Sequence, residues 1–306
     1  MPLPPDTRSV PLPREIDTSP LSGARPGGGQ GRVLIVAGSD SGGGAGVQAD
    51  IKTVTALGGY AATAVTALTA QNTLGVQDIL DVPPEFVARQ IAAVLEDIGA
   101  DCIKIGMLHR PEIVDAVCDA LAGAVAAGIP MVVDPVMVAK GGHPLLEPAA
   151  VESLRRRLVP LAAVLTPNLP EADVLAGTNG GGSEGGAATG RSPEALVERL
   201  LALGPRAVLL KGGHGEGLVL VDVLAELGRP TERFESARID TRNTHGTGCT
   251  LASAIACGIA QGLGVRAAVI RARAYVRAAI EEAPSFGSGH GPLGHGHTVR
   301  PFLGIG

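Results

Sequence analysis

Residues 33–46 of the chain read VLIVAGSDSGGGAG, an apolar run that ends in a glycine-rich loop. The run Val33–Ala37 is apolar at every position, which is typical of a strand buried on both faces of a sheet. A helical pattern follows Gly46, so the stretch reads as a strand, a loop and a helix. Parallel strands need such helical connections, and the stretch therefore indicates an α/β fold.

More apolar runs of strand length follow, and they alternate with helical patterns. Strands are expected at residues 63–69, 102–105, 131–133, 163–165 and 207–210, and helices at residues 86–97, 113–126 and 193–203. This alternation predicts a mostly parallel sheet that is covered by helices on both sides.

Polar or glycine-rich residues stand at the ends of the expected strands. They are Gly38–Gly46, Gln71, Gly106–Met107, Asp134, Asn168 and Lys211–Gly213. In an open α/β sheet, ligands bind beyond the carboxyl ends of the strands. We therefore expect one site to collect these groups.

The composition favours a small-molecule substrate. Of the 306 residues, 45% are hydrophobic and only 2% aromatic, and 25 Lys and Arg stand against 30 Asp and Glu. A net charge of −5 and few aromatic rings argue against a nucleic-acid partner and against a basic membrane-binding face. No apolar run reaches the roughly 20 residues that a membrane span needs.

The cysteine pattern and the ends of the chain bear on location and domain organisation. The four cysteines form no C-x-x-C pair and the N-terminus does not resemble a signal peptide, so we expect a reduced, cytoplasmic protein. Residues 1–32, rich in Pro and Gly, are expected to be a disordered tail, and residues 33–306 a single domain. Within it, residues 177–190 read as a flexible glycine-rich insertion.

Residues 243–250, NTHGTGCT, combine a glycine turn with the start of a small-residue helix. Such a start aims free backbone N–H groups and the positive end of the helix dipole at one point, so Gly246, Thr247 and Gly248 predict an anion hole. Cys249 lies in the first turn, where the same field favours a thiolate and makes it a candidate catalytic base. The alternative is that Cys249 is an ordinary buried small residue.

The glycine loop has two interpretations. The pattern Gly44-x-Gly46-x-x-Ala49 formally matches a dinucleotide-binding fingerprint, but no acidic residue stands at the end of the next strand, where Thr66–Gln71 occur. A loop whose backbone lies against a flat ring is the other interpretation. Asp50, in the following helix, is either an N-terminal cap or a ligand contact.

Several strand-end side chains have both a structural and a functional interpretation. The Gln71 amide can pair with a donor and an acceptor on a heteroaromatic ring. Asp134 and Glu171 together suit Mg²⁺. Asn168 and Glu171 also have the spacing of a capping box, and Lys211 either reaches a phosphate or extends to solvent along an apolar surface.

Seven motifs in order resemble the hydroxymethylpyrimidine/phosphomethylpyrimidine kinases of thiamine biosynthesis, over nearly all of residues 33–297. They are residues 37–50 (AGSDSGGGAGVQAD), 69–73 (TAQNT), 104–108 (KIGML), 134–137 (DPVM), 166–172 (TPNLPEA), 211–214 (KGGH) and 243–250 (NTHGTGCT). The resemblance implies a ribokinase-like three-layer αβα sandwich, a homodimer, and the use of ATP and Mg²⁺ to phosphorylate the hydroxymethyl group of the pyrimidine and then the resulting monophosphate.

The resemblance also assigns roles to residues of this sequence. It implies that Gly38, Asp50, Gln71 and Met107 surround the pyrimidine, that Asp134 and Glu171 lie near Mg²⁺ and the phosphates, and that Lys211 and Asn168 lie near the nucleotide. It further implies that Gly246, Thr247 and Gly248 form the anion hole. Our own mechanistic hypothesis is that Cys249 accepts the hydroxymethyl proton, for which we expect a pKa below about 8.5.

Three alternatives stay open at this point. A pyridoxal kinase of vitamin B6 salvage shares the scaffold and the cysteine, and its substrate is also a flat ring with a CH₂OH group. A dinucleotide-dependent oxidoreductase rests on the Gly44–Ala49 pattern alone. A sensor that binds nucleotide or vitamer without turnover is the third.

Overall fold

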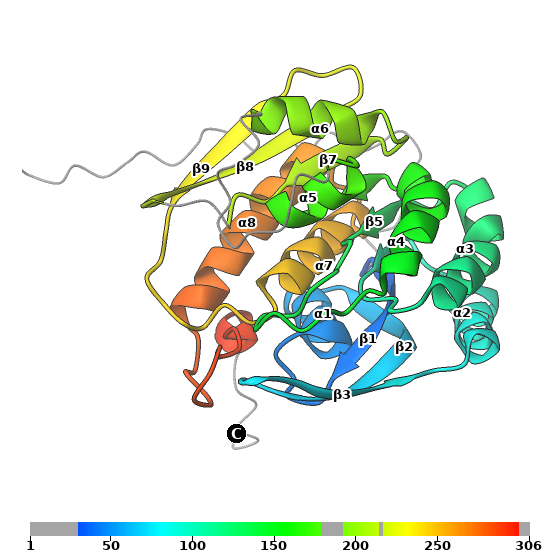
Figure 1. Ribbon diagram of the computed structural model, residues 1–306, viewed down its shortest axis with the longest axis horizontal. Coiled ribbons are helices and arrows are strands. Elements are labelled where there is room, and N and C mark those ends of the chain that lie inside the picture. Colours follow the sequence, from blue (N-terminus) through cyan, green and yellow to red (C-terminus); the bar gives the residue numbers. More distant parts are fainter. Residues whose placement is uncertain (1–29, 179–191, 214–216, 300–306) are drawn as a thin grey trace, which may run out of the picture.

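The computed structural model of the chain describes residues 30–178, 192–213 and 217–299, and in them nine strands form one sheet in the order β3-β2-β1-β4-β5-β6-β7-β8-β9 (Figure 1). From β2 to β7, neighbouring strands are parallel, whereas β3, β8 and β9 pair antiparallel at the two edges. The strands are β1 (Arg32–Asp40), β2 (Tyr60–Asn72), β3 (Gly75–Asp81), β4 (Cys102–Ile105), β5 (Met131–Val133), β6 (Val164–Leu165), β7 (Ala207–Leu210), β8 (Val219–Glu226) and β9 (Glu232–Ala237).

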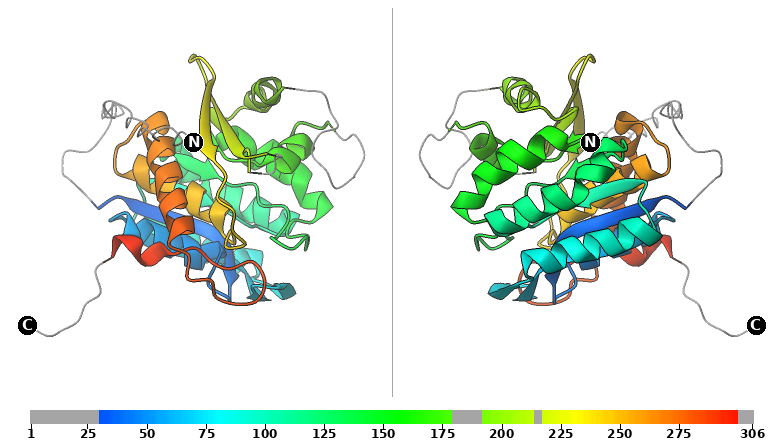
Figure 2. Two further views of the ribbon diagram at one scale, coloured as in Figure 1. Left: turned by 90° about the vertical axis from the view of Figure 1, so that its left-hand side faces the viewer. Right: turned by 90° about the vertical axis from the view of Figure 1, so that its right-hand side faces the viewer.

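Helices cover both faces of the sheet and make three layers (Figures 1 and 2). They are α1 (Gly46–Ala56), α2 (Pro84–Asp97), α3 (Pro111–Ala126), α4 (Pro148–Ser153), α5 (Leu169–Leu175), α6 (Pro193–Leu201), α7 (Thr247–Ala260) and α8 (Val265–Glu281), with helical turns at Leu154–Leu158, Val159–Leu161 and His295–Thr298. Val33 and Ile35 of β1 belong to the core under α1, α7 and α8, whereas Leu34 and Val36 belong to the core under α2 to α6. The mostly parallel α/β fold predicted from the sequence is confirmed.

The predicted elements agree with the structure in the centre of the sheet. The bounds of β4, β5 and β7 are those expected, and β6 begins one residue later than expected. The edge strands β3, β8 and β9 were not predicted, because half or more of the residues in each are at least partly exposed and the apolar run that marks a buried strand is missing.

Residues 30–32, the last three of the expected tail, are among the described residues. β1 begins at Arg32, whose backbone N–H donates to Asp101 Oδ2 at 2.9 Å and whose guanidinium forms an ion pair with the same carboxylate. The remainder of the expected tail, residues 1–29, and most of the expected insertion, residues 179–190, lie outside the described residues.

A fully buried ion pair joins the sheet to the layer of α1 and α7. Lys104 of β4 stands beside Ile35 in the sheet, and its side chain points to the same face. Its Nζ donates to both oxygens of Asp50 in α1, at 2.8 and 3.0 Å, and Ser253 of α7 donates to Asp50 Oδ1 at 2.7 Å. All three residues have no exposed surface. The pair therefore fixes where α1 and α7 lie on the sheet.

We predict that Lys104→Met lowers the free energy of unfolding by about 3–5 kcal/mol, because it leaves the Asp50 carboxylate buried without a counter-charge. The measurement is urea denaturation monitored by circular dichroism, and the double variant Lys104→Met with Asp50→Asn should recover much of the loss. The matched control is Arg156→Met, which removes an exposed helix-surface pair with Glu152 and should cost less than about 0.5 kcal/mol. Equal losses in Lys104→Met and the control would contradict the prediction.

Candidate active site

The start of α7 packs directly against the glycine loop that follows β1. Gly246 caps α7 with a φ of 84°, and a side-chain carbon there would lie 1.9 Å from the carbonyl oxygen of Gly44. Only glycine fits such a position, for both backbone and steric reasons. The first N–H groups of a helix have no partner within it. Here the N–H of Thr247 donates to the carbonyl oxygen of Thr244 at 3.4 Å, and the start of α7 as a whole lies beside the loop. The role of Gly246, Thr247 and Gly248 as an anion hole stays a prediction.

The acid–base state of Cys249 differs from the one expected from the sequence. Burial raises the pKa of its thiol to about 11, against a lowering effect of Lys104 and a further raising effect of Asp50 and Asp134. The backbone N–H of Gly46 also lowers this pKa, but by less than burial raises it. The expectation of a pKa below about 8.5 is not met in the protein without ligands, because loss of solvation and the charges of Asp50 and Asp134 outweigh the lowering effects of Lys104 and the Gly46 N–H. Cys249 is a thiol in this state.

Asp134, Lys211 and Glu171 form a charged cluster beside the anion hole. Lys211 Nζ donates to Asp134 Oδ1 at 2.8 Å and lies 3.9 Å from Glu171 Oε2. A side-chain carbon on Gly248 would lie 3.3 Å from Lys211 Nζ and 3.5 Å from Asp134 Oδ2, so the first turn of α7 faces the cluster. Burial opposes the ammonium form, yet the two carboxylates raise the pKa of Lys211 and keep it charged.

Asn168 and Glu171 form the capping box that their spacing predicts. Asn168 Oδ1 accepts from the N–H of Glu171 at 2.9 Å, and Glu171 Oε2 accepts from the N–H of Asn168 at 2.8 Å. Burial, opposed by Lys211 and reinforced by Asp134, raises the pKa of Glu171 to about 7. Glu171 therefore has a structural role at α5, and its role toward a metal stays a prediction.

The donor set at this cluster fits Mg²⁺ held jointly with phosphates. Among residues 30–178, 192–213 and 217–299, no three His, Cys, Asp or Glu side chains are grouped to hold a metal ion by themselves. Mg²⁺ commonly takes one or two carboxylates and completes its octahedron with water and substrate phosphates. Asp134 and Glu171 supply two such carboxylates on either side of Lys211.

Two of the residues expected around the ring, Gly38 and Met107, lie next to each other. A side-chain carbon on Gly38 would lie 2.9 Å from Met107 Sδ, so these two residues are in direct contact, and Met107 is 7% exposed. Gly38 also borders Gly46, whose backbone faces Cys249. The Gln71 amide, near the end of β2, lies 3.3 Å from His245 Nε2, two residues before the start of α7.

The structure gives Asp50 a different role from either predicted one. Asp50 is the fifth residue of α1, whose cap is Ala45 with no side-chain hydrogen bond, so the cap interpretation is wrong. Its two oxygens are taken by Lys104 and Ser253, and it has no exposed surface, which argues against direct contact with a substrate. Its negative charge instead raises the pKa of the Cys249 thiol.

Three functional side chains escaped the sequence interpretation. Lys104 had a visible signal, since it is the one charged residue in the apolar strand Cys102–Ile105. Asp40 and His245 had none, because they are 205 positions apart and meet only in the fold, with 2.9 Å between His245 Nε2 and Asp40 Oδ2.

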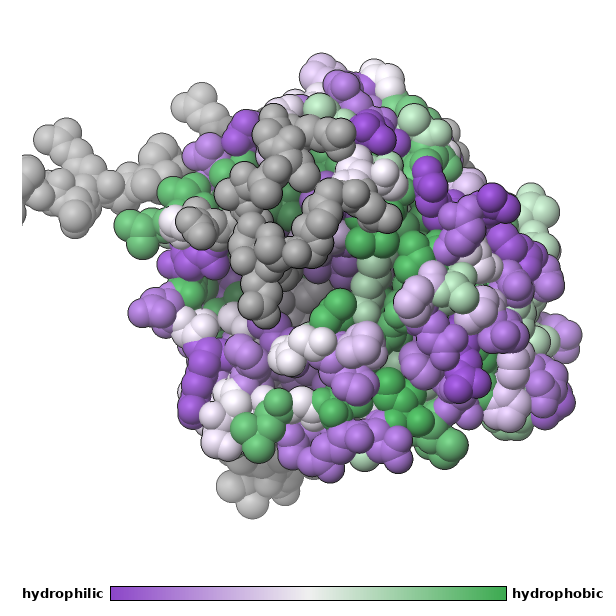
Figure 3. Space-filling model, in the orientation of Figure 1, coloured by the Kyte–Doolittle hydropathy of each residue, from purple (hydrophilic) through white to green (hydrophobic). Residues whose placement is uncertain are grey.

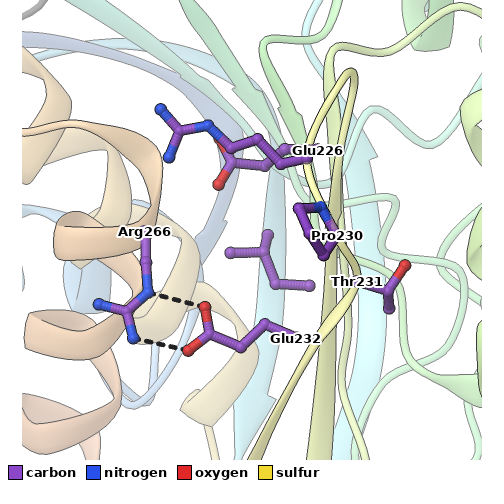
Figure 4. Close-up of a pocket in the computed structure, with 7 residues that line it drawn as sticks. Glu226, Pro230, Thr231, Glu232 and Arg266 are labelled. Carbon is purple, nitrogen blue, oxygen red and sulfur yellow. Dashed lines mark hydrogen bonds and ion pairs between the residues drawn. The ribbon is translucent and has the colours of Figure 1, made fainter.

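A separate hollow lies away from these residues, between the β8–β9 hairpin and α8 (Figure 4). Its wall includes Glu226, Thr231, Glu232 and Arg266, and Arg266 donates to both oxygens of Glu232, at 2.7 and 2.6 Å. None of the residues predicted to bind ligand lines it.

In the part of the chain that the structure describes, no helix has the length and apolarity that a membrane span requires.

We predict that alkylation of Cys249 in the protein without ligands increases about tenfold for each pH unit from 7 to 10, because the thiol stays mostly protonated below its raised pKa. Iodoacetamide labelling, followed by mass spectrometry of the Cys249 peptide, measures the rate, and Cys249→Ser identifies that peptide. A rate that levels off below pH 9 would show instead that the helix field dominates burial.

Comparison with known proteins agrees with the geometry of this site. The family model described as phosphomethylpyrimidine kinase matches residues 40–294. A hydroxymethylpyrimidine/phosphomethylpyrimidine kinase of Rhizobium meliloti is 47% identical over 267 residues, which cover 87% of this chain and 97% of that protein. The thiamine biosynthesis bifunctional protein ThiED of Geobacter sulfurreducens is 52% identical over 266 residues, and the match covers 87% of this chain but only 52% of the longer relative.

A solved structure supports the same fold. An ADP complex of Bacillus subtilis pyridoxal kinase superimposes with a TM-score of 0.76 at 33% sequence identity, covering 88% of this chain and 98% of that one. Because the family model, the sequence relatives and the three-layer architecture agree, the chain belongs to the phosphomethylpyrimidine kinase family and has a ribokinase-like fold.

Proposed function

We propose that this chain transfers phosphate from ATP to the hydroxymethyl group of 4-amino-5-hydroxymethyl-2-methylpyrimidine, and then to the resulting monophosphate, in thiamine biosynthesis. The observation that carries the proposal is the start of α7, where Gly248 faces Asp134 and Lys211 on one side while His245 reaches Gln71 on the other. The groups that we propose bind the ring and the phosphates thus lie at one helix start. The relatives named above support the same activity.

The proposed division of labour follows from the charges of the site. Gln71, Gly38 and Met107 hold the ring, Lys211 and Asn168 contact the nucleotide, and Gly246, Thr247 and Gly248 hold the transferring group. Phosphoryl transfer depends mainly on positioning and on stabilisation of charge on the phosphoryl oxygens, which these donors supply. Mg²⁺ held by Asp134 and Glu171 would neutralise phosphate charge and the local negative charge that raises the pKa of Cys249.

The proton transfer is assigned to Cys249 with Lys104 in support. Cys249 is a thiol in the absence of ligands, so we propose that it becomes a base only when positive charge arrives beside Asp134. Lys104 already lowers the pKa of this thiol, which gives the buried ammonium a second role beyond stability.

Pyridoxal kinase is the second candidate, and the superposition with the Bacillus subtilis enzyme is the observation that favours it. The identity of 33% to that enzyme is lower than the 47% to the Rhizobium meliloti kinase, so the thiamine-pathway substrate is preferred. Nothing among the relatives named here supports a dinucleotide-dependent oxidoreductase.

The decisive experiment is product analysis with ATP and Mg²⁺, in which the pyrimidine alcohol, its monophosphate and pyridoxal are offered separately. We expect diphosphate from both pyrimidine substrates, because a second phosphorylation distinguishes this activity from a pyridoxal kinase. Turnover of pyridoxal alone would assign the chain to vitamin B6 salvage.

We predict that Cys249→Ala lowers the turnover number of the first phosphorylation by about 10²–10⁴-fold, the range of general-base catalysis. The second phosphorylation should lose much less, since its nucleophile is a phosphate oxygen that is already ionised near neutral pH. The matched control is Cys257→Ala, a buried cysteine later in α7, which should not distinguish the two steps. Equal losses in both steps would refute the base assignment.

We further propose that residues 33–306 act as one kinase domain in a cytoplasmic homodimer. Apolar side chains are exposed around β3, where Leu68, Leu74 and Leu80 are 47%, 69% and 67% exposed, and Figure 3 shows apolar residues among polar ones along that edge of the molecule. A second copy of the chain would cover these side chains.

The proposed location rests on the cysteines. All four cysteines of the chain are free thiols, which is consistent with a reducing compartment. A monomeric mass in light scattering would refute the dimer, and recovery of the protein outside the cytoplasm on cell fractionation would refute the location.

A further inference from the structure

Asp40 organises the glycine loop through its two carboxylate oxygens. Oδ1 accepts from the N–H of Gly42 at 2.8 Å, and Oδ2 accepts from the N–H groups of Gly44 and Ala45 at 3.0 and 2.8 Å. Asp40 is 2% exposed. Burial favours its neutral form, but His245 and these backbone donors together lower its pKa, so the side chain is a carboxylate.

The ionised carboxylate fixes the proton on His245. His245 Nε2 lies 2.9 Å from Asp40 Oδ2, and His245 is 7% exposed. Two acceptors at that distance would repel each other, so Nε2 carries a proton and donates it to Asp40. The imidazole also packs against the loop, since a side-chain carbon on Gly44 would lie 2.4 Å from His245 Cδ2.

This proton then decides which way the Gln71 amide faces. Gln71 Nε2 lies 3.3 Å from His245 Nε2, and Gln71 Oε1 lies 3.0 Å from the hydroxyl of Thr69. In that arrangement two N–H groups face each other. The single proton of the Thr69 hydroxyl has a second acceptor at 2.9 Å, the carbonyl oxygen of Ser39. A half-turn of the amide removes the contact between two donors. Oε1 then accepts from His245, whose single Nε2 proton is shared between Asp40 Oδ2 at 2.9 Å and the amide at 3.3 Å, while Nε2 donates to Thr69.

We propose that Asp40 and His245 are positioning residues that hold the Gln71 amide with its oxygen toward His245 and its amino group toward Thr69. The proposal deepens the proposed function and rests on it, because Gln71 is there the leading contact to the ring. Held in this way, the amide has one N–H and one oxygen lone pair left for a ligand, in a fixed order. We call the arrangement of Asp40, His245 and Gln71 the clamp. It selects a ring that offers an acceptor next to a donor.

The pyrimidine substrate offers this pair, whereas pyridoxal does not. The ring nitrogen next to the amino-bearing carbon accepts a hydrogen bond, and the exocyclic amino group beside it donates one. Pyridoxal has no exocyclic amino group, and its phenolic hydroxyl is on a carbon that is not bonded to the ring nitrogen, so this donor and this acceptor do not lie side by side. The clamp also connects ring recognition to the anion hole, since His245 directly precedes Gly246.

A double-mutant cycle tests whether His245 acts through Gln71. The dissociation constant of the pyrimidine alcohol is measured by isothermal titration calorimetry for the wild type, His245→Ala, Gln71→Ala and the double variant. We expect about fivefold weaker binding for His245→Ala, about tenfold for Gln71→Ala, and no further loss in the double variant. A double variant weakened by about fiftyfold, the product of the single losses, would overturn the proposal.

Two further experiments test the clamp. A control variant distinguishes it from a general effect on the folding of the loop, and a measurement without ligand does not depend on the identity of the substrate. Lys52→Met removes the hydrogen bond from Lys52 Nζ to the carbonyl oxygen of Gly43, and should leave binding unchanged. Nitrogen-15 NMR of labelled histidine in the wild type should show His245 protonated at Nε2, and an unprotonated Nε2 would overturn the clamp. If the wild type does not bind the pyrimidine, the proposed function fails, while the position of this proton still decides the clamp.

Discussion

The buried ion pair between Lys104 and Asp50 is the constraint on which the rest of the site depends. A charge inside the core is tolerated only with a partner at hydrogen-bond distance, so β4, α1 and, through Ser253, α7 have one relative position. A side-chain carbon on Gly106 would lie 2.9 Å from Lys104 Nζ, so the strand end is also shaped around the ammonium. Because α1 and α7 both begin at the candidate active site, fixing these helices fixes the backbone groups that we propose face the substrate.

Close contact between two glycine turns builds the site and also sets its chemistry. The carbonyl of Gly44 lies where any side chain on Gly246 would be, and Gly248 leaves open the space toward Asp134 and Lys211. The start of α7, whose residues 246–249 are partly exposed, is thereby brought against the glycine loop. Loss of solvation raises the pKa of Cys249, so tight packing and an easily ionised thiol are opposed in the ligand-free protein. In the proposed function, positive charge that arrives beside Asp134 lowers the pKa of Cys249 while the packing stays the same.

How far the sequence predicted the structure depended on the range of the interactions. The central strands β4, β5 and β7 were predicted with their bounds, since burial on both faces leaves an uninterrupted apolar run. The capping box of Asn168 and Glu171 was predicted because it spans three residues and needs nothing else. The half-exposed edge strands, the Asp40–His245 contact and the partner of Lys104 depend on segments far apart in the chain, and no local pattern marks them.

The sequence by itself determined the fold class, the family and the order of the motifs along the strand ends, because periodicity and short-range spacing are written in neighbouring residues. Only the tertiary structure decided that Asp50 is an internal counter-ion, that Cys249 is a thiol without ligands, and that His245 faces both Asp40 and Gln71. Protonation and hydrogen-bond polarity depend on the solvent that is lost and on the charges a few ångströms away. Both are properties of the packed chain and not of the order of its residues.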